Sequence, residues 1–243
     1  MVRLPAWLTL KLAKARIAQI FNSAPSGPLL HCVHPAEVLH PGSVAPVSRK
    51  KMRGLMENPA PVIWIDGNEP LLHAGIGHFV RAIAQTGHCI FLETDGTCLR
   101  RRIHEFQPRP ELFLTVRLNS LQLPEFSLAV EGLRAARLSG FFTVVHSAVR
   151  ENVDCAQLAA LRSYMAEKDM DGWLITAESS NEAVVRKATE ARRLIRSSFW
   201  RQFSEHVEEA LLSQTPARKL REAQAFVPES LQAEAGEEGV RIA

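Results

Sequence analysis

The sequence predicts an α/β fold, a partial (β/α)6 TIM-like barrel of parallel strands, because two neighbouring segments repeat the same order of elements. The run at residues 61–66 is mostly apolar and β-branched, ends in the turn Gly67-Asn68-Glu69-Pro70 and leads into helical spacing over residues 71–86. The run at residues 89–92 leads in the same way through residues 93–97 into a basic helix. Repeated units of this kind favour a parallel sheet, in which ligands bind at the carboxyl ends of the strands.

Six strands are expected along the chain, at residues 29–33, 62–65, 89–92, 111–118, 141–146 and 172–176. Helical patterns lie between them, at residues 48–57, 75–85, 99–106, 127–138 and 154–167. Gly87 and Gly140 each follow a helix and are expected to end it, since glycine accepts the left-handed conformation found there. A closed barrel of this type needs eight strands, so six strands predict an open or partial barrel.

The chain divides into four predicted parts. Residues 1–27 form an amphipathic helix and a Ser/Pro/Gly linker, and residues 28–180 form the partial barrel. Residues 181–213 are expected as a C-terminal helix, or two helices, that cover the open side or the edge of the sheet. Residues 214–243 are rich in Ala, Glu, Gln and Arg, which is typical of a disordered tail or a frayed helix.

The N-terminal helix, residues 8–21, is basic and amphipathic. Its apolar residues are expected on one face; they are Leu8, Leu12, Ile17, Ile20 and Phe21. Lys11, Lys14 and Arg16 add positive charge, so residues 4–21 suit either an anionic membrane surface or packing on the domain as a cap. No apolar run reaches the roughly 18 residues that span a bilayer, and no small-residue cleavage site follows the helix.

Composition and charge fit a globular cytoplasmic protein with one substantial core, peripheral at the inner face of the membrane if the N-terminal helix docks there. The chain has 243 residues, of which 46% are hydrophobic and 23% charged. A net charge of +3 argues against a dedicated nucleic-acid binder, which carries a clustered basic face. The four cysteines contain no C-x-x-C and no pair at metal-ligand spacing, which favours buried free thiols in a reducing compartment.

Several segments in fixed order carry a resemblance to a known family. They are GNEPLLH at residues 67–73, LETDGT at 92–97, LRRR at 99–102, residues 108–118, residues 135–141 and MDGWLI at 170–175. Together they resemble a radical S-adenosylmethionine (SAM) domain, closest to the hopanoid-associated type that adds an adenosyl group to a hopene. The segment LAKAR at residues 12–16 also resembles the leader of that subgroup.

The resemblance implies a [4Fe–4S] cluster held by a C-x-x-x-C-x-x-C loop after the first strand, with SAM bound to the fourth iron. In this chain Cys32 stands at the first ligand position, but Ala36 and Leu39 stand at the second and third. Alanine and leucine cannot ligate iron, and one thiolate cannot replace three. We therefore expect no cluster, no metal site and no radical chemistry, and hence a degenerate motif and a pseudoenzyme.

Two further departures concern the SAM pocket and the substrate side. The family has Gly-Gly-Glu-Pro at the first turn, and Asn68 replaces the second glycine; asparagine tolerates positive φ, but its side chain projects near the methionine subsite. The family also has a longer segment after residues 118–120, where this chain has only residues 121–125.

The residues expected to bind a cofactor all follow strand ends; they are Gly67, Asn68, Glu69, Pro70, Thr94, Asp95, Arg117 and Asn119. Each has a structural alternative. Glu69 either retains part of a SAM pocket or serves the turn alone, and Asp95 either bonds a ribose or amine or N-caps the next helix. Arg117 either binds a carboxylate or pairs with Glu93.

Other polar and aromatic residues receive no catalytic role. His73 lies at the pocket rim without an acid in triad-like order. His146 ends the fifth predicted strand, where it either points into the barrel mouth or is a hydrogen-bonded rim residue, and Trp64 and Trp173 are expected in the core.

The sequence thus favours a cluster-free radical-SAM-like protein with a binding or accessory role, linked to hopanoid or other lipid metabolism and partnered by a related radical SAM enzyme. Two alternatives stay open. The first is an enzyme that binds SAM, or that acts with an atypical or partner-supplied cluster. The second is an accessory protein on a membrane surface.

Overall fold

The computed structural model describes residues 5–21, 28–34, 49–67, 69–122 and 124–225 of the chain. It divides into two units, residues 1–212 and residues 213–243. The first unit holds the sheet and its helices, and the second begins inside the last helix, which ends at Ala225. The fold described below is that of the first unit.

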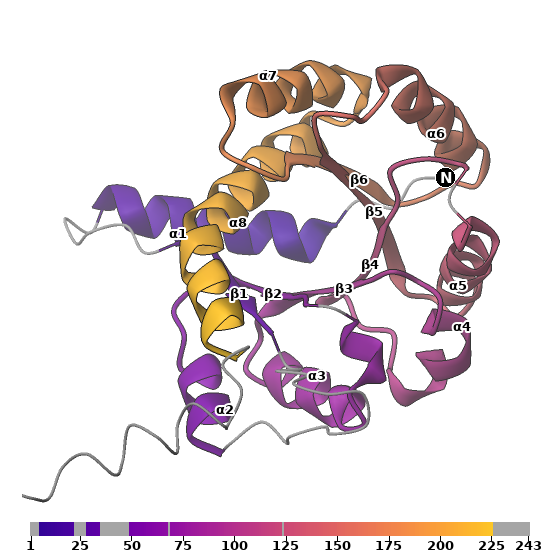
Figure 1. Cartoon of the computed structure of the whole chain (residues 1–243). Helices are drawn as coiled ribbons and strands as arrows, with labels where there is room; N and C mark the ends of the chain where they lie inside the picture. Colours follow the sequence, from indigo (N-terminus) through magenta and orange to yellow (C-terminus); the bar gives the residue numbers. More distant parts are fainter. Residues whose placement is uncertain (1–4, 22–27, 35–48, 68, 123, 226–243) are drawn as a thin grey trace, which may run out of the picture. The chain divides into compact units, whose positions relative to one another are not determined.

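One six-stranded sheet organises this unit, and its neighbouring strands are all parallel. The strands follow chain order: β1 (Leu30–Val33), β2 (Val62–Ile65), β3 (Cys89–Thr94), β4 (Leu112–Arg117), β5 (Phe142–Val149) and β6 (Gly172–Ala177). The sheet curls into a half-barrel, with the helices that connect its strands on the outside (Figure 1). The predicted partial (β/α)6 barrel is confirmed.

Helices α1 (Ala6–Phe21) and α2 (Arg49–Met56) precede the second strand. The later connections contain η1 (Pro70–Leu72), α3 (Ile76–Ala84), α4 (Leu99–Arg102), η2 (Ile103–Glu105), α5 (Phe126–Leu138) and α6 (Cys155–Glu167). After β6 come α7 (Glu182–Ala191), η3 (Arg192–Leu194) and α8 (Ser198–Ala225). Gly87 and Gly140 have φ values of 79° and 89°, which explains why glycine follows α3 and α5.

Two expected elements differ from those observed. The predicted helix over residues 99–106 is a four-residue α4 that tightens into η2. The strand predicted at residues 141–146 continues to Val149, because buried residues beyond His146 pair with β6. The C-terminal region, expected as one helix or two, forms α7 and α8 with η3 between them.

An aromatic layer fills the inner face of the half-barrel. The strand register aligns Trp64, Phe91, Phe113 and Phe142 across β2 to β5. Trp64 stacks on Phe91 with ring centroids 5.3 Å apart, and Phe91 stacks on Phe113 at 4.5 Å. Phe203 of α8 lies against the same layer, 5.1 Å from Phe91. Large aromatic rings therefore form the core on the concave side, where a closed barrel would have further strands.

Side chains of α8 also form hydrogen bonds with backbone groups along the outer edge of β6. Trp200 Nε1 donates a hydrogen bond to the Asp171 carbonyl, the Ser204 hydroxyl accepts one from the Ile175 N–H, and the Glu208 carboxylate accepts one from the Ala177 N–H. These three side chains are spaced four residues apart and so lie on one face of the helix. An open sheet edge invites pairing with another chain, and α8 covers this one with side chains.

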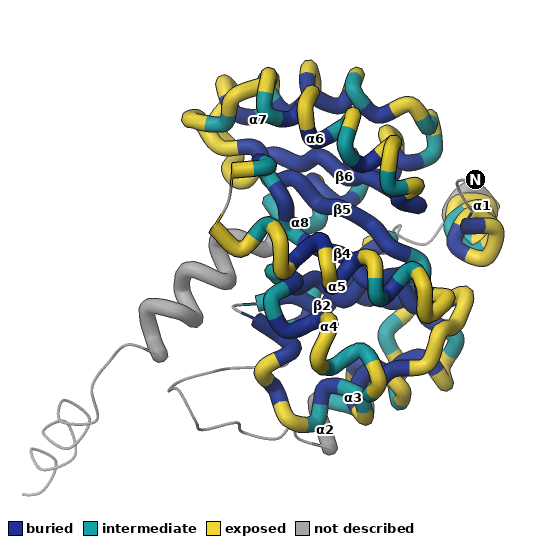
Figure 2. The backbone as a smooth tube through the Cα atoms, turned by 90° about the vertical axis from the view of Figure 1, so that its right-hand side faces the viewer, coloured by how far each residue is buried: buried dark blue, intermediate teal, exposed yellow. Residues whose placement is uncertain are grey.

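The cysteines are all free thiols, but their burial is mixed. Cys89 and Cys98 are buried as expected, whereas Cys32 is half-buried. Cys155 is exposed at the first position of α6, which corrects the expectation that every thiol is buried. Trp64 and Trp173 are both buried, which confirms them as core residues (Figure 2 shows the buried strands). Within the described residues, no helix is both long enough and apolar enough to cross a membrane.

Candidate functional site

The predicted site residues gather at the carboxyl ends of β2, β3 and β4. Gly67 and Glu69 follow β2, while Thr94 ends β3 and Asp95 comes next. Arg117 ends β4, with Asn119 two residues further on. Pro70 begins η1, and Asn68 lies outside the described residues. Because the strands are parallel and adjacent, the fold brings these turns to one edge, as the sequence predicted.

Glu69 joins two of these turns through its carboxylate. It accepts hydrogen bonds from the Leu71 N–H at 2.9 Å, the Thr94 hydroxyl at 2.8 Å and the Asp95 N–H at 2.8 Å. Burial raises the pKa of Glu69 to about 7, even though these hydrogen bonds favour the charged form. Glu69 is thus an N-cap of η1 that ties the end of β2 to the end of β3.

Asp95 shapes the turn after β3. Its Oδ1 accepts hydrogen bonds from the backbone N–H and the hydroxyl of Thr97, at 2.8 and 2.7 Å. The expected alternative, an N-cap of the following helix, is wrong, because α4 begins at Leu99 with Cys98 as its N-cap residue. The short polar side chain instead bonds its own backbone two residues on, which is an Asx turn.

A buried ionic network lies one position deeper in the half-barrel, around Glu93. Its carboxylate lies 3.1 Å from Arg117 Nε and 3.3 Å from His146 Nδ1, and it accepts a hydrogen bond from Trp64 Nε1 at 2.9 Å. Burial by itself would raise the pKa of Glu93, but His146, Arg117 and the indole outweigh it and hold that pKa below its ordinary value. The expected pairing of Arg117 with Glu93 is confirmed.

Arg117 and His146 extend this network in two directions. Arg117 Nη2 donates to the Gly67 carbonyl at 3.3 Å, which connects the network to the first turn. His146 Nε2 lies 2.8 Å from the Thr176 hydroxyl on β6. His146 was expected at a strand end on the barrel rim, but it lies in the middle of β5 and is 3% exposed. It is therefore an inward-facing residue of the core.

Glu93 was not among the predicted site residues, although the sequence held a signal for it. Side chains alternate between the two faces of a strand, so Phe91 and Glu93 face the same side. The register places Glu93 beside Thr115, whose buried hydroxyl has no hydrogen-bond partner within the described residues. Asn119 Oδ1 is also buried without such a partner. The edge thus offers these two side-chain oxygens, while the carboxylates of Glu69 and Glu93 already accept hydrogen bonds from the protein itself.

Two histidines near this edge have structural partners. His34 Nδ1 lies 2.6 Å from the Asp66 carboxylate, which joins the ends of β1 and β2. His73 is buried, and its Nδ1 accepts a hydrogen bond from the Gly75 N–H at 3.0 Å. Both therefore contribute to the shape of the edge.

The described residues do not bring three cysteine thiols together in the way that a [4Fe–4S] cluster requires. Cys32 lies within β1, in register with Trp64, and residues 35–39 lie outside the described residues. Cys89 begins β3, Cys98 precedes α4, and Cys155 begins α6. Across the described segments, no three His, Cys, Asp or Glu side chains are grouped as metal ligands. One cysteine with Ala36 and Leu39 does not fit the cluster.

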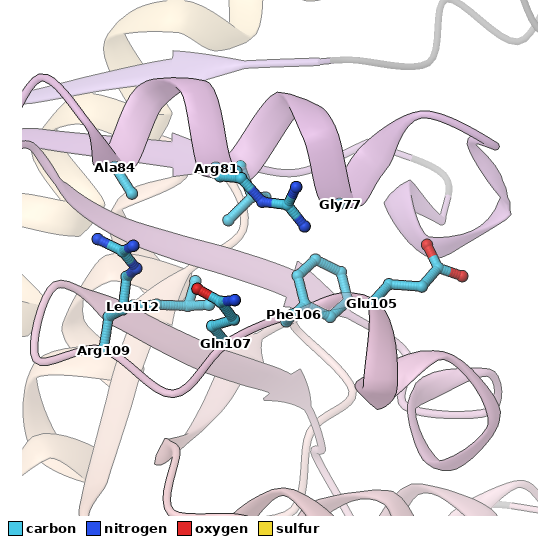
Figure 3. A pocket seen from close by; sticks show the side chains of 9 residues that line it. Gly77, Arg81, Ala84, Glu105, Phe106, Gln107, Arg109 and Leu112 are labelled. Atoms are coloured by element: carbon cyan, nitrogen blue, oxygen red, sulfur yellow. The ribbon is translucent and has the colours of Figure 1, made fainter.

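A small cavity lies on the outer side of the sheet, between α3 and the segment that leads into β4. Its volume is about 20 Å³, enough for about one water molecule. Its lining includes the apolar side chains of Val80 and Phe106. Arg81 extends from α3 on one side, and Phe106 and Arg109 come from the segment before β4 on the other (Figure 3). This cavity is too small for a nucleotide and lies away from the strand ends.

No protein-family model matches this chain, and no curated protein matches it either. Among solved structures, the crystal structure of archaeal TYW1 is similar, with 13% sequence identity and a TM-score of 0.36. The similarity covers 66% of this chain and 53% of that chain, so this chain spans about half the length of that protein. A TM-score of this size does not assign the chain to a family.

Proposed function

We propose that this chain is a radical-SAM-like partial barrel that has lost its cluster ligands and serves as a binding or accessory protein, linked to hopanoid or other lipid metabolism. Its partner would be a related radical SAM enzyme. The proposal rests on the sequence motifs together with one structural observation. The charged groups of Glu69 and Arg117 at the carboxyl edge bond to the protein itself, which holds the turns after β2, β3 and β4 together.

The hydrogen bonds and the ion pair of Glu69 and Arg117 connect the turns at this edge. Glu69 receives three donors from the protein, and Arg117 bridges the Glu93 carboxylate and the Gly67 carbonyl. If a bound cofactor shaped this turn, the Glu69 carboxylate and the Arg117 guanidinium would be expected to lack protein partners in its absence, which is costly for buried groups. Both groups have protein partners, whereas within the described residues Thr115 Oγ1 and Asn119 Oδ1 do not. This arrangement fits a protein that retains the turns of a cofactor-binding edge but holds them in place with its own hydrogen bonds and ion pairs.

The decisive experiment restores the two lost thiols. After anaerobic reconstitution with iron and sulfide, the natural chain should hold no stoichiometric iron, whereas the double variant Ala36→Cys/Leu39→Cys should acquire a cluster with its visible absorbance. The two single variants are the matched controls, since two thiolates bind a cluster poorly. Stoichiometric iron in the natural chain would overturn the proposed loss, and a folded double variant without iron would contradict the alignment of this loop with the cluster motif.

A second candidate, binding of SAM without a cluster, is favoured by the convergence of Gly67, Glu69, Thr94 and Arg117 at one edge. Titration calorimetry of the natural chain with SAM distinguishes the two functions. Saturable heat that Thr94→Val reduces would favour the SAM-binding protein. The absence of heat, together with an unchanged melting temperature in excess SAM, would favour the accessory role.

A further inference from the structure

Helix α1 is attached to the half-barrel by one side only. Leu8 is fully buried and Leu12 packs against the core. Lys11 Nζ bonds to the Gly87 carbonyl, and Arg16 Nη2 lies 2.7 Å from His206 Nε2 on α8. These contacts of Leu8, Lys11, Leu12 and Arg16 define an inner face. They correct the expectation that Leu8 and Leu12 share a face with Ile17 and Phe21.

The outer face of α1 carries a stripe of large apolar side chains. Trp7, Leu10, Ile17 and Phe21 are 39%, 46%, 53% and 81% exposed. Their spacing of three, seven and four residues places them on one side of the helix, with exposed Lys14 in the middle of the stripe. Figure 2 shows α1 nearly along its axis, with buried and exposed parts around its circumference. Single exposed apolar residues are ordinary, but four in one stripe indicate an interaction surface.

The charge of α1 indicates what this surface contacts. The helix sequence AWLTLKLAKARIAQIF contains Lys11, Lys14 and Arg16 and no acidic residue. Lys11 is bonded to the Gly87 carbonyl and Arg16 contacts His206, while exposed Lys14 lies within the stripe itself. An apolar stripe with tryptophan and phenylalanine near its ends and a lysine at its centre, on a helix without acidic residues, is typical of a helix that lies in the interface of an anionic bilayer.

A second copy of the chain fits this stripe less well. Lys14 lies midway between Trp7 and Phe21, so pairing two stripes about their centres, parallel or antiparallel, brings the two Lys14 ammonium groups together. Like charges in a contact that excludes water are unfavourable. On a membrane, Lys14 extends its apolar stem along the surface and places its charge among lipid phosphates. We propose that α1 docks this protein on an anionic phospholipid bilayer, with Trp7, Leu10, Ile17 and Phe21 inserted into the interface.

The test is co-sedimentation of the full chain with vesicles of phosphatidylcholine, alone or mixed with phosphatidylglycerol. We expect the natural chain to pellet with the mixed vesicles, and the double variant Ile17→Ser/Phe21→Ser to lose at least about tenfold in partitioning because its insertion is weaker. Leu138→Ser on α5 is the matched control, since Leu138 is 88% exposed away from the stripe, and it should pellet like the natural chain.

Lys14→Glu separates the electrostatic part of the binding from the apolar part. This variant should bind the mixed vesicles more weakly and leave any residual binding to neutral vesicles unchanged. Equal partitioning of the natural chain and Ile17→Ser/Phe21→Ser would overturn the proposal. A natural chain that sediments as a dimer in solution, and that this double variant converts to a monomer, would assign the stripe to a second copy instead.

Discussion

The indole of Trp200 lies directly against Gly172 at the start of β6. A Cβ atom at position 172 would lie 2.6 Å from Cε2 and from Cζ2 of the indole ring. The ring is held there because its Nε1 donates a hydrogen bond of 2.9 Å to the Asp171 carbonyl. The absence of a side chain at residue 172 therefore allows α8 to approach the edge of the sheet.

Gly172→Ala should destabilise the protein by about 2 kcal/mol, since the ring or the strand must shift in a packed core. The free energy of unfolding in urea measures this. Gly54→Ala on α2 is the matched control, because a Cβ atom there would have no neighbour within 4 Å apart from the adjacent residues and the backbone of its own helix, and it should be neutral or slightly stabilising. A Gly172→Ala protein as stable as the natural one would contradict the close contact.

The half-barrel was predictable from the sequence because its strands are bounded by local signals. Apolar runs and polar turns define β2 and β3, and the glycines Gly87 and Gly140 separate α3 from β3 and α5 from β5, without knowledge of tertiary contacts. The extension of β5 was missed because His146 and Ser147 are polar, and their burial depends on Glu93 of β3 and on Leu118, which directly follows β4.

The sequence does not show that α8 covers the edge of β6, or which side of α1 is buried, because both depend on contacts between distant segments. The helical spacing of Trp200, Ser204 and Glu208 is visible in the sequence. Their hydrogen-bond partners, which are backbone groups of residues 171, 175 and 177, follow only from the position of β6. In α1 the burial of Leu8 and the exposure of Phe21 follow from where the helix docks. At the site, the convergence of the turns after β2, β3 and β4 was predictable from parallel topology, whereas the bonds of Glu93 were not.

Glu208→Ala should destabilise the edge of β6. The change removes the acceptor for the Ala177 N–H and leaves the guanidinium of Arg192, which is 4% exposed, without its carboxylate partner. We expect a loss of about 3 kcal/mol in the free energy of unfolding, because a buried charge is left uncompensated. Hydrogen exchange at the Ala177 amide should also become faster.

The neighbouring Glu209 supplies the control for this change. Glu209 is exposed, so Glu209→Ala should alter neither stability nor exchange at Ala177 beyond a few tenths of a kcal/mol. Unchanged protection of Ala177 in the Glu208→Ala protein would mean that the side chain does not cover the strand edge.

Glu93→Ala should cost about 3 kcal/mol of stability, because it removes the buried carboxylate that pairs with Arg117 and His146 and accepts the Trp64 indole N–H. Glu131→Ala is the matched change at the surface, where the pair with Arg100 is exposed on both sides and should contribute less than about 1 kcal/mol. Urea unfolding of both variants provides the comparison, and equal losses would argue against a buried network.

Because of the Glu93 carboxylate, the stability of the protein should fall in acid. The pKa of Glu93 is lowered in the folded state, so its contribution is present above the pKa of the unfolded chain and is lost as the pH falls through the folded value. The stability difference between the natural chain and Glu93→Gln should therefore shrink below about pH 4. A stability difference that stays constant as the pH falls well below 4 would contradict the lowered pKa.

Glu69 predicts the opposite dependence, since burial raises its pKa to about 7 in the folded chain, above its ordinary value of 4.5. Between these two values the folded protein retains a proton that the unfolded chain releases. The contribution of Glu69 is therefore complete below the lower value and is lost as the pH rises towards 7. The loss is on the order of 3 kcal/mol, at 1.36 kcal/mol for each unit of difference.

Unfolding in urea at several pH values from 5 to 8 measures this effect against Glu69→Gln, which has no proton to release in that range. The natural chain should lose stability relative to the variant between pH 5 and 7, and the difference should level off above pH 7. Subtracting the two curves removes the titration of groups that both proteins share. Parallel curves would mean that the hydrogen bonds from Leu71, Thr94 and Asp95 keep Glu69 ionised despite its burial.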